Sequence, residues 1–329
     1  MSLDASVLSA IGNTPMAELQ RMTAGKKAKI FAKMEFCNPS GSTKDRMALY
    51  IINDAEERGL LKPGGVIVEN SSGNTGSALA MIAAVKGYRC IITMPDKMSR
   101  EKQNLMRAFG AEVVVTPTDV PADSPESYYS TARRIASETP GSFYPDQYNN
   151  PKNIEAHFRS TGPEIYRQMN GKIDYFVAGI GTGGTLSGVA RYLKEKDPNI
   201  KIIAVDPEGS VFYDYFKTGK LPEPHVYQVE GIGEDYLVKA VDFDIIDDIY
   251  QVNDRDSFLT GRRLCREEGL FAGGSSGSAV WAALKLADKI DADANIVVVL
   301  PDSGNRYLSK MYNDDWMIEK GYLSPGDKS

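Results

Sequence analysis

The feature that most limits the folds open to this chain is the alternation of short apolar runs with amphipathic stretches. Runs rich in Val and Ile predict strands at 28–35, 65–70, 90–95, 112–117, 175–180, 200–207 and 295–302. Apolar residues at helical spacing predict helices at 75–88, 99–111, 185–198, 257–268 and 276–290. Buried strands bracketed by helices are typical of parallel sheets that are covered on both faces. The sequence therefore predicts an α/β fold.

Length and charge narrow the classes of partner. A chain of 329 residues is long enough for about two domains or subdomains. The net charge of −6 implies no broad basic surface, so we do not expect nucleic acid as a partner. No apolar run approaches the roughly 20 residues of a membrane-spanning helix, so we expect no membrane association.

The start of the chain, the cysteines and the histidines argue against a secreted protein and against a metal site. The start of the chain shows no basic segment followed by an apolar core, so we expect no secretory leader. Cys37, Cys90 and Cys265 are widely separated, which fits a reduced, cytoplasmic protein. His157 and His225 are the only two histidines. We therefore expect neither a metal site nor a histidine-based triad.

Glycine-rich turns mark the candidate site. SSGNTGS follows the predicted strand at 65–70, GTGGTLSG follows the one at 175–180, and LFAGGSSGS leads into the helix at 276–290. A further loop, NPSGSTKDR (38–46), carries Lys44. In open α/β sheets, ligands bind at the carboxyl ends of strands, beside helix N-termini. We expect these turns and the Lys44 loop to converge on one cleft.

The turn after residue 180 suits an anion, because consecutive backbone N–H groups precede a predicted helix. The residues concerned are Gly181, Thr182, Gly183, Gly184 and Thr185. The same stretch also matches G-x-G-x-x-G, with Asp206 about 20 residues further on, as in dinucleotide-binding folds. That motif is weak when alone, and it leaves Lys44 and SSGNTG unexplained. Glycines that only form a tight turn are the third interpretation.

Lys44, taken together with the anion site, suggests which ligand the cleft binds. Pyridoxal phosphate carries a phosphate at one end and, at the other, an aldehyde that forms a Schiff base with lysine. One such cofactor would join the phosphate turn to the lysine loop. A solvated surface lysine is the ordinary interpretation of any single lysine.

Several motifs in order carry a resemblance to a known family. NPSGSTKDR resembles the lysine motif of the fold-type II pyridoxal-phosphate enzymes, the cysteine synthase and cystathionine β-synthase family. IGNTPM (11–16), SSGNTGSALA (71–80), GTGGT (181–185) and GGSSGS (273–278) resemble its other signatures. The resemblance covers nearly the whole chain. It implies two open, twisted, mostly parallel sheets flanked by helices, as in tryptophan synthase β.

The resemblance also implies roles for individual residues. Lys44 would form the Schiff base and later move protons, Asn74 would bind the phenolic oxygen of the cofactor, and residues 181–185 would hold its phosphate. The substrate carboxylate would be bound by Ser71, Ser72, Asn74, Thr75 and Gln147. A serine that only caps a helix remains an alternative for SSGNTG, and Gln147 is alternatively a turn residue.

Ser275 would face the pyridine nitrogen of the cofactor. A hydroxyl in place of an acid leaves that nitrogen largely unprotonated, which weakens the electron sink and favours loss of a β-substituent. Cys37 is interpreted as a packing residue, because neither histidine is near it in the sequence.

The motifs VDPEGS, YQVEGIGEDYL, LPDS and WMIEKGYL resemble cystathionine β-synthases more than O-acetylserine sulfhydrylases. We expect the loop of Gly231, Ile232 and Gly233 to lie over the cleft and to shape the site of the second substrate. Glu234 and Asp235 would then meet the amino group of an amino-acid thiol such as homocysteine. A solvated acidic loop is the alternative.

The implied reaction replaces the β-substituent of L-serine, or of an O-activated serine, by a thiol through an α-aminoacrylate intermediate. With homocysteine the product is L-cystathionine. Alternatives are a cysteine synthase that uses O-acetyl- or O-phosphoserine with sulfide, a diamino-acid or lanthionine synthase, a serine or threonine dehydratase, and an NAD-dependent oxidoreductase. A non-catalytic binding protein is the last alternative.

The resemblance finally implies how the molecule is organised. Residues 46–146 would form a smaller mobile subdomain that carries the substrate-carboxylate loop. Residues 1–45 and 147–329 would form the larger cofactor-binding domain. The expected partners are small amino-acid substrates and a second copy of the chain in a homodimer.

Overall fold

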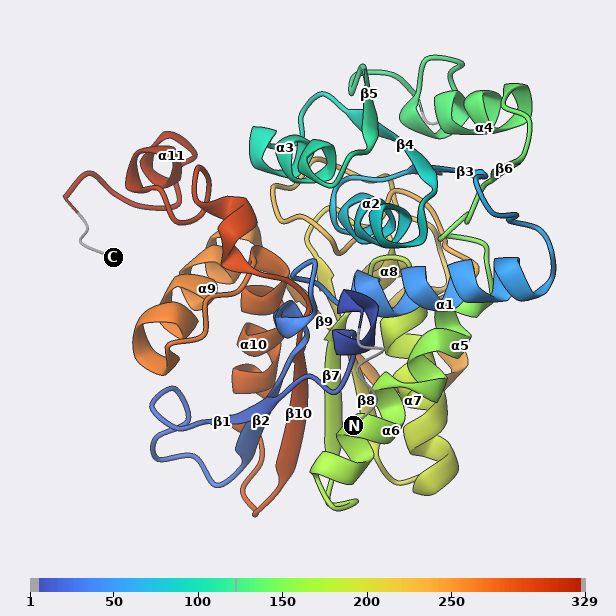
Figure 1. The fold of residues 1–329 in the computed structure, drawn as a ribbon. Coiled ribbons are helices and arrows are strands. Elements are labelled where there is room, and N and C mark those ends of the chain that lie inside the picture. Colours follow the sequence, from blue (N-terminus) through green and yellow to red (C-terminus); the bar gives the residue numbers. More distant parts are fainter. Residues whose placement is uncertain (1–5, 122, 327–329) are drawn as a thin grey trace.

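The computed structural model describes residues 6–121 and 123–326, and its strands form two separate sheets (Figure 1). The larger sheet has six strands in the order β1-β2-β10-β7-β8-β9 and the smaller has four in the order β5-β4-β3-β6. The strands are β1 (Met16–Leu19), β2 (Lys29–Met34), β3 (Val66–Asn70), β4 (Arg89–Pro95), β5 (Glu112–Thr116), β6 (Ser142–Phe143), β7 (Tyr175–Gly179), β8 (Lys201–Pro207), β9 (Asp248–Val252) and β10 (Asn295–Leu300).

Helices cover the sheets, as Figure 1 shows. They are α1 (Lys44–Glu57), α2 (Asn74–Lys86), α3 (Arg100–Ala108), α4 (Tyr128–Glu138), α5 (Lys152–Arg159), α6 (Thr161–Gln168), α7 (Gly184–Lys196), α8 (Phe212–Thr218), α9 (Asp254–Glu268), α10 (Gly274–Ala287) and α11 (Asp314–Glu319). Short 3-10 helices lie at η1 (Val7–Ala10), η2 (Glu35–Cys37), η3 (Phe243–Ile245) and η4 (Gly304–Tyr307).

Each sheet is packed on both faces, which explains its apolar strands. In the larger sheet, alternate residues of β7 point to opposite cores: Phe176 packs with α6 and α7, whereas Val177 packs with α9 and α10. In the smaller sheet, Ile67 packs with α2 and α3, and Val68 packs with α4. A strand that is buried on both faces has no polar alternation, so its sequence is a continuous apolar run.

All strand pairs are parallel except β1 with β2. The parallel pairing of β2 with β10 joins Lys29 to Asn295, and therefore joins two distant parts of the chain. The smaller sheet lies within residues 66–143, between these two strands in sequence. The carboxyl ends of β3 and β7 consequently lead into glycine-rich turns at the boundary between the two sheets.

The predicted α/β class with two mostly parallel sheets is confirmed. All seven predicted strands are present within one or two residues of their expected bounds, and so are the five predicted helices apart from larger shifts at some helix ends. No helix was predicted in residues 210–237, where the structure has α8. Strands β1, β6 and β9 were not predicted. Among the described residues, none of the helices is both long and apolar enough to cross a membrane.

Candidate active site

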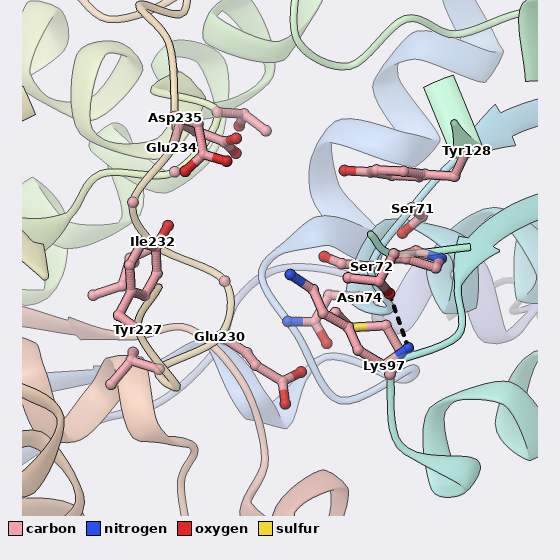
Figure 2. A pocket seen from close by; sticks show the side chains of 18 of the residues that line it. Ser71, Ser72, Asn74, Lys97, Tyr128, Tyr227, Glu230, Ile232, Glu234 and Asp235 are labelled. Carbon is pink, nitrogen blue, oxygen red and sulfur yellow. Dashed lines mark hydrogen bonds between the residues drawn. The ribbon is translucent and has the colours of Figure 1, made fainter. Parts of the chain in front are cut away.

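A cavity of about 510 Å³ lies where the carboxyl ends of the two sheets meet, and Figure 2 shows the side chains around it. A second, narrow cavity of about 40 Å³ adjoins it beneath the turn that follows β7. The two share Lys44, Asn74, Gly181, Thr182, Gly231 and Ile232 as lining residues. They therefore form one continuous site with a wide outer part and a narrow inner part.

The structure brings nearly all of the predicted site residues to this place. The outer cavity is lined by Lys44, Ser71, Ser72, Asn74, Thr75, Gln147, Gly181, Thr182, Gly231, Ile232 and Gly233. The inner cavity adds Gly183, Thr185 and Ser275. Gly184 lines neither cavity, because its Cα faces the Asn153 side chain on α5.

Lys44 is the first residue of α1, and its ammonium end lies in both cavities. Its Nζ donates to Thr182 Oγ1 at 3.4 Å. Burial lowers the pKa of Lys44 to about 8, although the carboxylates of Glu234 and Asp302 act in the opposite direction. A neutral amine is the nucleophilic form, and the lowered pKa gives Lys44 a larger neutral fraction than a surface lysine has.

Asn74 is the first residue of α2, and only the nitrogen of its side-chain amide has a hydrogen-bond partner among the described residues. Its Nδ2 donates to Asp302 Oδ2 at 2.8 Å, and the same oxygen accepts from the Tyr307 hydroxyl at 2.7 Å. Its Oδ1 is buried and finds no hydrogen-bond partner within residues 6–121 and 123–326. A buried polar atom without a partner is costly, so the amide is held in an orientation that suits a polar ligand.

The turn of residues 181–185 has the shape of an anion cup. Gly183 has φ +82°, and a Cβ there would lie 2.7 Å from the Ala240 backbone. A Cβ on Gly181 would lie 2.7 Å from the Gly231 carbonyl oxygen. Glycine is thus required at both positions, and Gly183 and Thr185, at the start of α7, line the inner cavity.

The loop of residues 71–76, where the resemblance places the substrate carboxylate, is organised by Ser71 and Gln147. Ser71 Oγ accepts from the backbone N–H groups of Gly73 and Gly76 at 3.0 and 2.9 Å, so it caps α2 as the alternative interpretation expected. Thr75 Oγ1 donates to Gln147 Oε1 at 2.6 Å, and Gln147 Nε2 donates to the Asn70 carbonyl at 3.1 Å. Gln147 lies in a turn after β6, as the alternative interpretation expected, and it is also buried and hydrogen-bonded to this loop.

The loop of residues 231–233 packs on the end of β7. Gly233 N–H donates to the Ile180 carbonyl at 2.6 Å, and Ile232 lines both cavities. Burial and the neighbouring Asp235 raise the pKa of Glu234 to about 8, although the Tyr148 hydroxyl donates to it. Glu234 and Asp235 face the outer cavity from the side opposite Ser72 and Asn74 (Figure 2).

The inner end of the site is closed by Ser275, the second residue of α10, which is buried and lines the narrow cavity. Asp206, which the dinucleotide interpretation used, accepts the N–H of Tyr213 at the start of α8 instead. The site thus offers an anion cup, a reactive lysine, an amide with an unpaired oxygen and a buried hydroxyl. These groups fit the phosphate, aldehyde, phenolic oxygen and ring nitrogen of pyridoxal phosphate.

Sequence reasoning missed four contributors. Asp302 orients Asn74 across 228 residues of chain, and its position directly after β10, in LPDS, was the available signal. Asn153, on α5, donates from Nδ2 to Thr182 Oγ1 in the anion cup at 3.0 Å. Tyr128 and Tyr148 line the outer cavity, where Tyr128 lies beside Ser71 (Figure 2). No short sequence motif identifies Asn153, Tyr128 or Tyr148.

Comparison with known proteins agrees with this geometry. Residues 7–302 match the family model described as "Pyridoxal-phosphate dependent enzyme". The cystathionine beta-synthase of Apis mellifera is 49% identical over 321 residues, which are 97% of this chain and 63% of that protein. The cystathionine beta-synthase of Rattus norvegicus is 50% identical over 319 residues, which are 96% of this chain and 57% of that protein. The chain therefore spans less than two thirds of the length of these relatives.

Solved structures extend the comparison to other reactions. An O-ureido-L-serine synthase is 37% identical with a TM-score of 0.87, over 99% of this chain and 98% of that one. A hydrogen sulfide-producing enzyme from Fusobacterium nucleatum is 38% identical with a TM-score of 0.86, over 93% of this chain and 100% of that one. Both the sequence and the fold therefore show that this chain belongs to the pyridoxal-phosphate dependent enzyme family, with a catalytic core like that of the cystathionine β-synthases.

Proposed function

We propose that this chain catalyses β-replacement on L-serine or an O-activated serine by homocysteine, giving L-cystathionine. The observation that carries the proposal is the position of Lys44. Its Nζ lies in a cavity that also contains Asn74 and the anion cup of residues 181–185. The identity of about half of all residues to cystathionine β-synthases supports this choice of substrates.

Pyridoxal phosphate, when bound, supplies an aldehyde that condenses with amines and a ring that accepts the electron pair left at Cα. The chain itself supplies the proton movements. Neutral Lys44 removes the Cα proton of the substrate at Nζ and returns it after the thiol has added. The lowered pKa of Lys44 supports this role, because a base works best when its pKa is near the working pH.

The substrate carboxylate is assigned to the loop at the start of α2. Ser72 and Thr75 present hydroxyls there, backbone N–H groups point outward, and the helix dipole favours a negative charge. Ser71 retains its hydroxyl hydrogen for donation, since its lone pairs accept from Gly73 and Gly76. Gln147 acts through Thr75, whose hydroxyl it holds.

The second substrate is assigned to the outer cavity. Glu234 and Asp235 would bind its ammonium group, and a bound cation would lower the pKa of Glu234 again. We also propose that residues 46–146 move toward the rest of the chain when the carboxylate binds, and thereby exclude water. The molecule is proposed to act as a homodimer, as the family resemblance implies.

The visible absorption spectrum tests the proposal. The purified protein should show a yellow band from the cofactor, and L-serine should shift it to longer wavelength. Homocysteine should then restore the original band with formation of cystathionine. A band that ignores L-serine but responds to O-acetyl- or O-phosphoserine would replace the donor. Pyruvate release without a thiol would instead indicate a dehydratase.

The alternative within the same chemistry is a different nucleophile. The similarity to an O-ureido-L-serine synthase and to a hydrogen sulfide-producing enzyme favours it. Competition between homocysteine and sulfide at equal concentration separates the two, because the major product identifies the preferred thiol. Predominant cysteine would reassign the chain to cysteine synthesis.

A further inference from the structure

Helix α5 supports the anion cup through two side chains that no motif identified. Asn153 and His157 lie one helical turn apart, and both are buried. Asn153 Nδ2 donates to Thr182 Oγ1 at 3.0 Å, and His157 Nε2 lies 3.2 Å from Thr185 Oγ1. Two adjacent positions of one helix face therefore each contact a hydroxyl of the cup.

This close approach depends on two glycines of α7. A Cβ on Gly184 would clash with the Asn153 amide, and one on Gly188 would clash with the Ile154 carbonyl oxygen and lie 2.8 Å from His157 Cβ. The spacing of four residues places both glycines on the face of α7 that meets α5. The close contact between α5 and α7 therefore depends on the absence of side chains at these two positions.

The hydrogen atoms at Asn153 can be assigned without ambiguity. Its Nδ2 donates to the Gln147 carbonyl oxygen at 2.9 Å and to Thr182 Oγ1. A carbonyl oxygen only accepts, so the NH2 group of the amide must face both partners. Thr182 Oγ1 consequently accepts from Asn153, and its own hydrogen remains available to donate into the cavity.

His157 has the same relation to Thr185. Burial, assisted by the nearby Arg46, lowers the pKa of His157 to about 3, so the ring is neutral and carries one hydrogen. Its Nδ1 lies 2.8 Å from Thr161 Oγ1, and its Nε2 faces Thr185. If the hydrogen is on Nε2, Thr185 accepts it and can donate its own hydrogen to an anion. If it is on Nδ1, the Thr185 hydroxyl donates to the ring and its hydrogen is lost to the cup.

We propose that His157 is a positioning residue that carries its hydrogen on Nε2, holds Thr185 Oγ1 as an acceptor and thereby turns the Thr185 hydroxyl hydrogen toward the cofactor phosphate. Thr161 donates to Nδ1 and fixes this tautomer. The inference rests on residues 181–185 being the phosphate site, as in the proposed function. It assigns His157 no contact with the substrate and no proton transfer.

Two substitutions distinguish this role from simple packing. In His157→Gln the side-chain amide reaches toward Thr185 and can still donate to it, whereas in His157→Asn the shorter amide reaches only the Thr161 side. The dissociation constants of pyridoxal phosphate and of pyridoxal, which lacks the phosphate, are measured by absorbance for apoenzyme of the full chain. Melting temperatures of the apoenzymes monitor folding.

His157→Asn should weaken pyridoxal phosphate about 10- to 100-fold, as expected for one hydrogen bond to a charged group, and should leave pyridoxal unchanged. His157→Gln should stay within a fewfold of the parent for both ligands. Because Thr185→Ala removes the hydroxyl, His157→Asn should add no further loss in that background. The phosphorus resonance of the bound cofactor should move in His157→Asn and not in His157→Gln.

The inference is overturned if His157→Asn weakens both ligands equally, or if it weakens neither. It is equally overturned if the losses from His157→Asn and Thr185→Ala simply add, because independent effects exclude a shared hydrogen bond. A parent protein that binds pyridoxal and pyridoxal phosphate equally well would instead contradict the phosphate site, and so the proposed function itself.

Discussion

At the scale of single residues, the chemistry of the cavity depends on how much positive charge Lys44 carries. A fully hydrated lysine is almost entirely protonated at neutral pH and is a poor nucleophile. Burial at the start of α1 brings the pKa of Lys44 to about 8, while Glu234 and Asp302 limit the shift. A useful fraction of neutral amine therefore exists near neutrality.

The rate at which apoenzyme combines with pyridoxal phosphate should accordingly depend on pH. The lowered pKa means that the neutral amine increases as the pH rises, so the rate should increase from pH 6 and level off above about pH 8. Stopped-flow absorbance of the yellow band measures it. In Lys44→Ala the band should be absent, although phosphate contacts retain the cofactor. A rate that keeps rising in parallel with free lysine, toward pH 10, would contradict the lowered pKa.

Asp302 provides a second test at this scale. Asp302→Ala removes the acceptor that orients the Asn74 amide, so kcat should fall by about 10- to 100-fold, the loss expected for a hydrogen bond to a charged group. Asp302→Asn keeps an acceptor oxygen and should retain most of kcat. Both variants remove a negative charge near Lys44, and both pH profiles should therefore shift to lower pH. Equal kcat values in the two variants would exclude the orienting role.

The residues that the sequence could identify are those in short continuous motifs. Lys44, Asn74 and Ser275 each lie within the first two residues of a helix, in a glycine- or serine-rich motif, so local pattern and family resemblance identify them. Asp302 and His157 act through tertiary contacts with partners far along the chain. No local pattern encodes such a contact, because it exists only when the sheets have assembled.

At the scale of elements, a buried ionic network fixes the start of α1. Arg46 donates to Glu35, next to β2, at 2.7 and 2.8 Å, and to Glu164 of α6 at 2.7 Å. Lys33 of β2 also donates to Glu164, at 2.9 Å. Since Lys44 is two residues before Arg46, this network helps to hold the reactive amine in place.

Removing one charge from this network should be costly. Glu35→Gln should lower the free energy of unfolding by about 3–5 kcal/mol, because Arg46 stays buried with an incomplete set of partners. Chemical denaturation measures the loss. Glu267→Gln, which disturbs the exposed pair with Arg263, should cost about 1 kcal/mol or less. A similar cost for the two variants would contradict the network.

The difference in stability between the parent and Glu35→Gln should depend on pH, and the sign of this dependence follows from the pKa of Glu35. Burial alone would raise the pKa of Glu35, but Arg46 and the Thr14 hydroxyl outweigh it and lower the value to about 2. A carboxyl with a lowered pKa in the folded state stabilises it above the unfolded-state pKa and loses this effect as the pH falls. The difference between parent and Glu35→Gln should therefore be full above about pH 4.5 and shrink toward pH 2.

Elements were predictable where burial on both faces dictates their composition. Six of the seven predicted strands are mostly buried segments of this kind, and the edge strand β5, which is largely accessible, is recognisable from its run of three valines. By contrast, β1 is a short antiparallel edge strand, β6 has two residues and β9 is an edge strand that is only half-buried. Helices α5 and α6 are separated by a break at Ser160 and have eight residues each, so their periodicity is too short to recognise. Their packing on α7, and not their own sequence, decides that they form.

At the scale of the whole molecule, the ion pair of Lys102 and Glu230 joins α3, which covers the smaller sheet, to the rest of the chain. Lys102 of α3 donates to Glu230, which also accepts from Lys310 Nζ at 2.6 Å. The aliphatic part of Lys102 lies against Gly73, in the loop that we propose binds the substrate carboxylate, and a Cβ on Gly73 would clash with it. Under that proposal, occupation of the loop by a substrate is linked to the contact between the two parts.

L-serine should then slow hydrogen exchange in both partners of this contact. We expect greater protection of amides in α3 and in residues 227–237, because the proposed closure removes them from water. Hydrogen–deuterium exchange with mass spectrometry of the holoenzyme measures it. Helix α9, which packs with α10 on one face of the larger sheet, serves as the internal control. Uniform protection of all three segments would indicate general stabilisation without closure.

The pairing of β2 with β10 has a consequence for synthesis on the ribosome. Lys29 emerges early, but its partner Asn295 is made only near the end of the chain. The smaller sheet, within residues 66–143, is complete long before that. Beside Lys44, the Thr43 N–H donates to the Pro301 carbonyl oxygen, and Ser42 forms an isolated antiparallel β-bridge with Asp302. A growing chain therefore carries a finished smaller sheet and an unpaired hairpin of β1 and β2, and its reactive lysine acquires its surroundings only when the last strand arrives. A chain that ends before β10 therefore lacks the strand that pairs with β2 and the residues that contact the Lys44 loop.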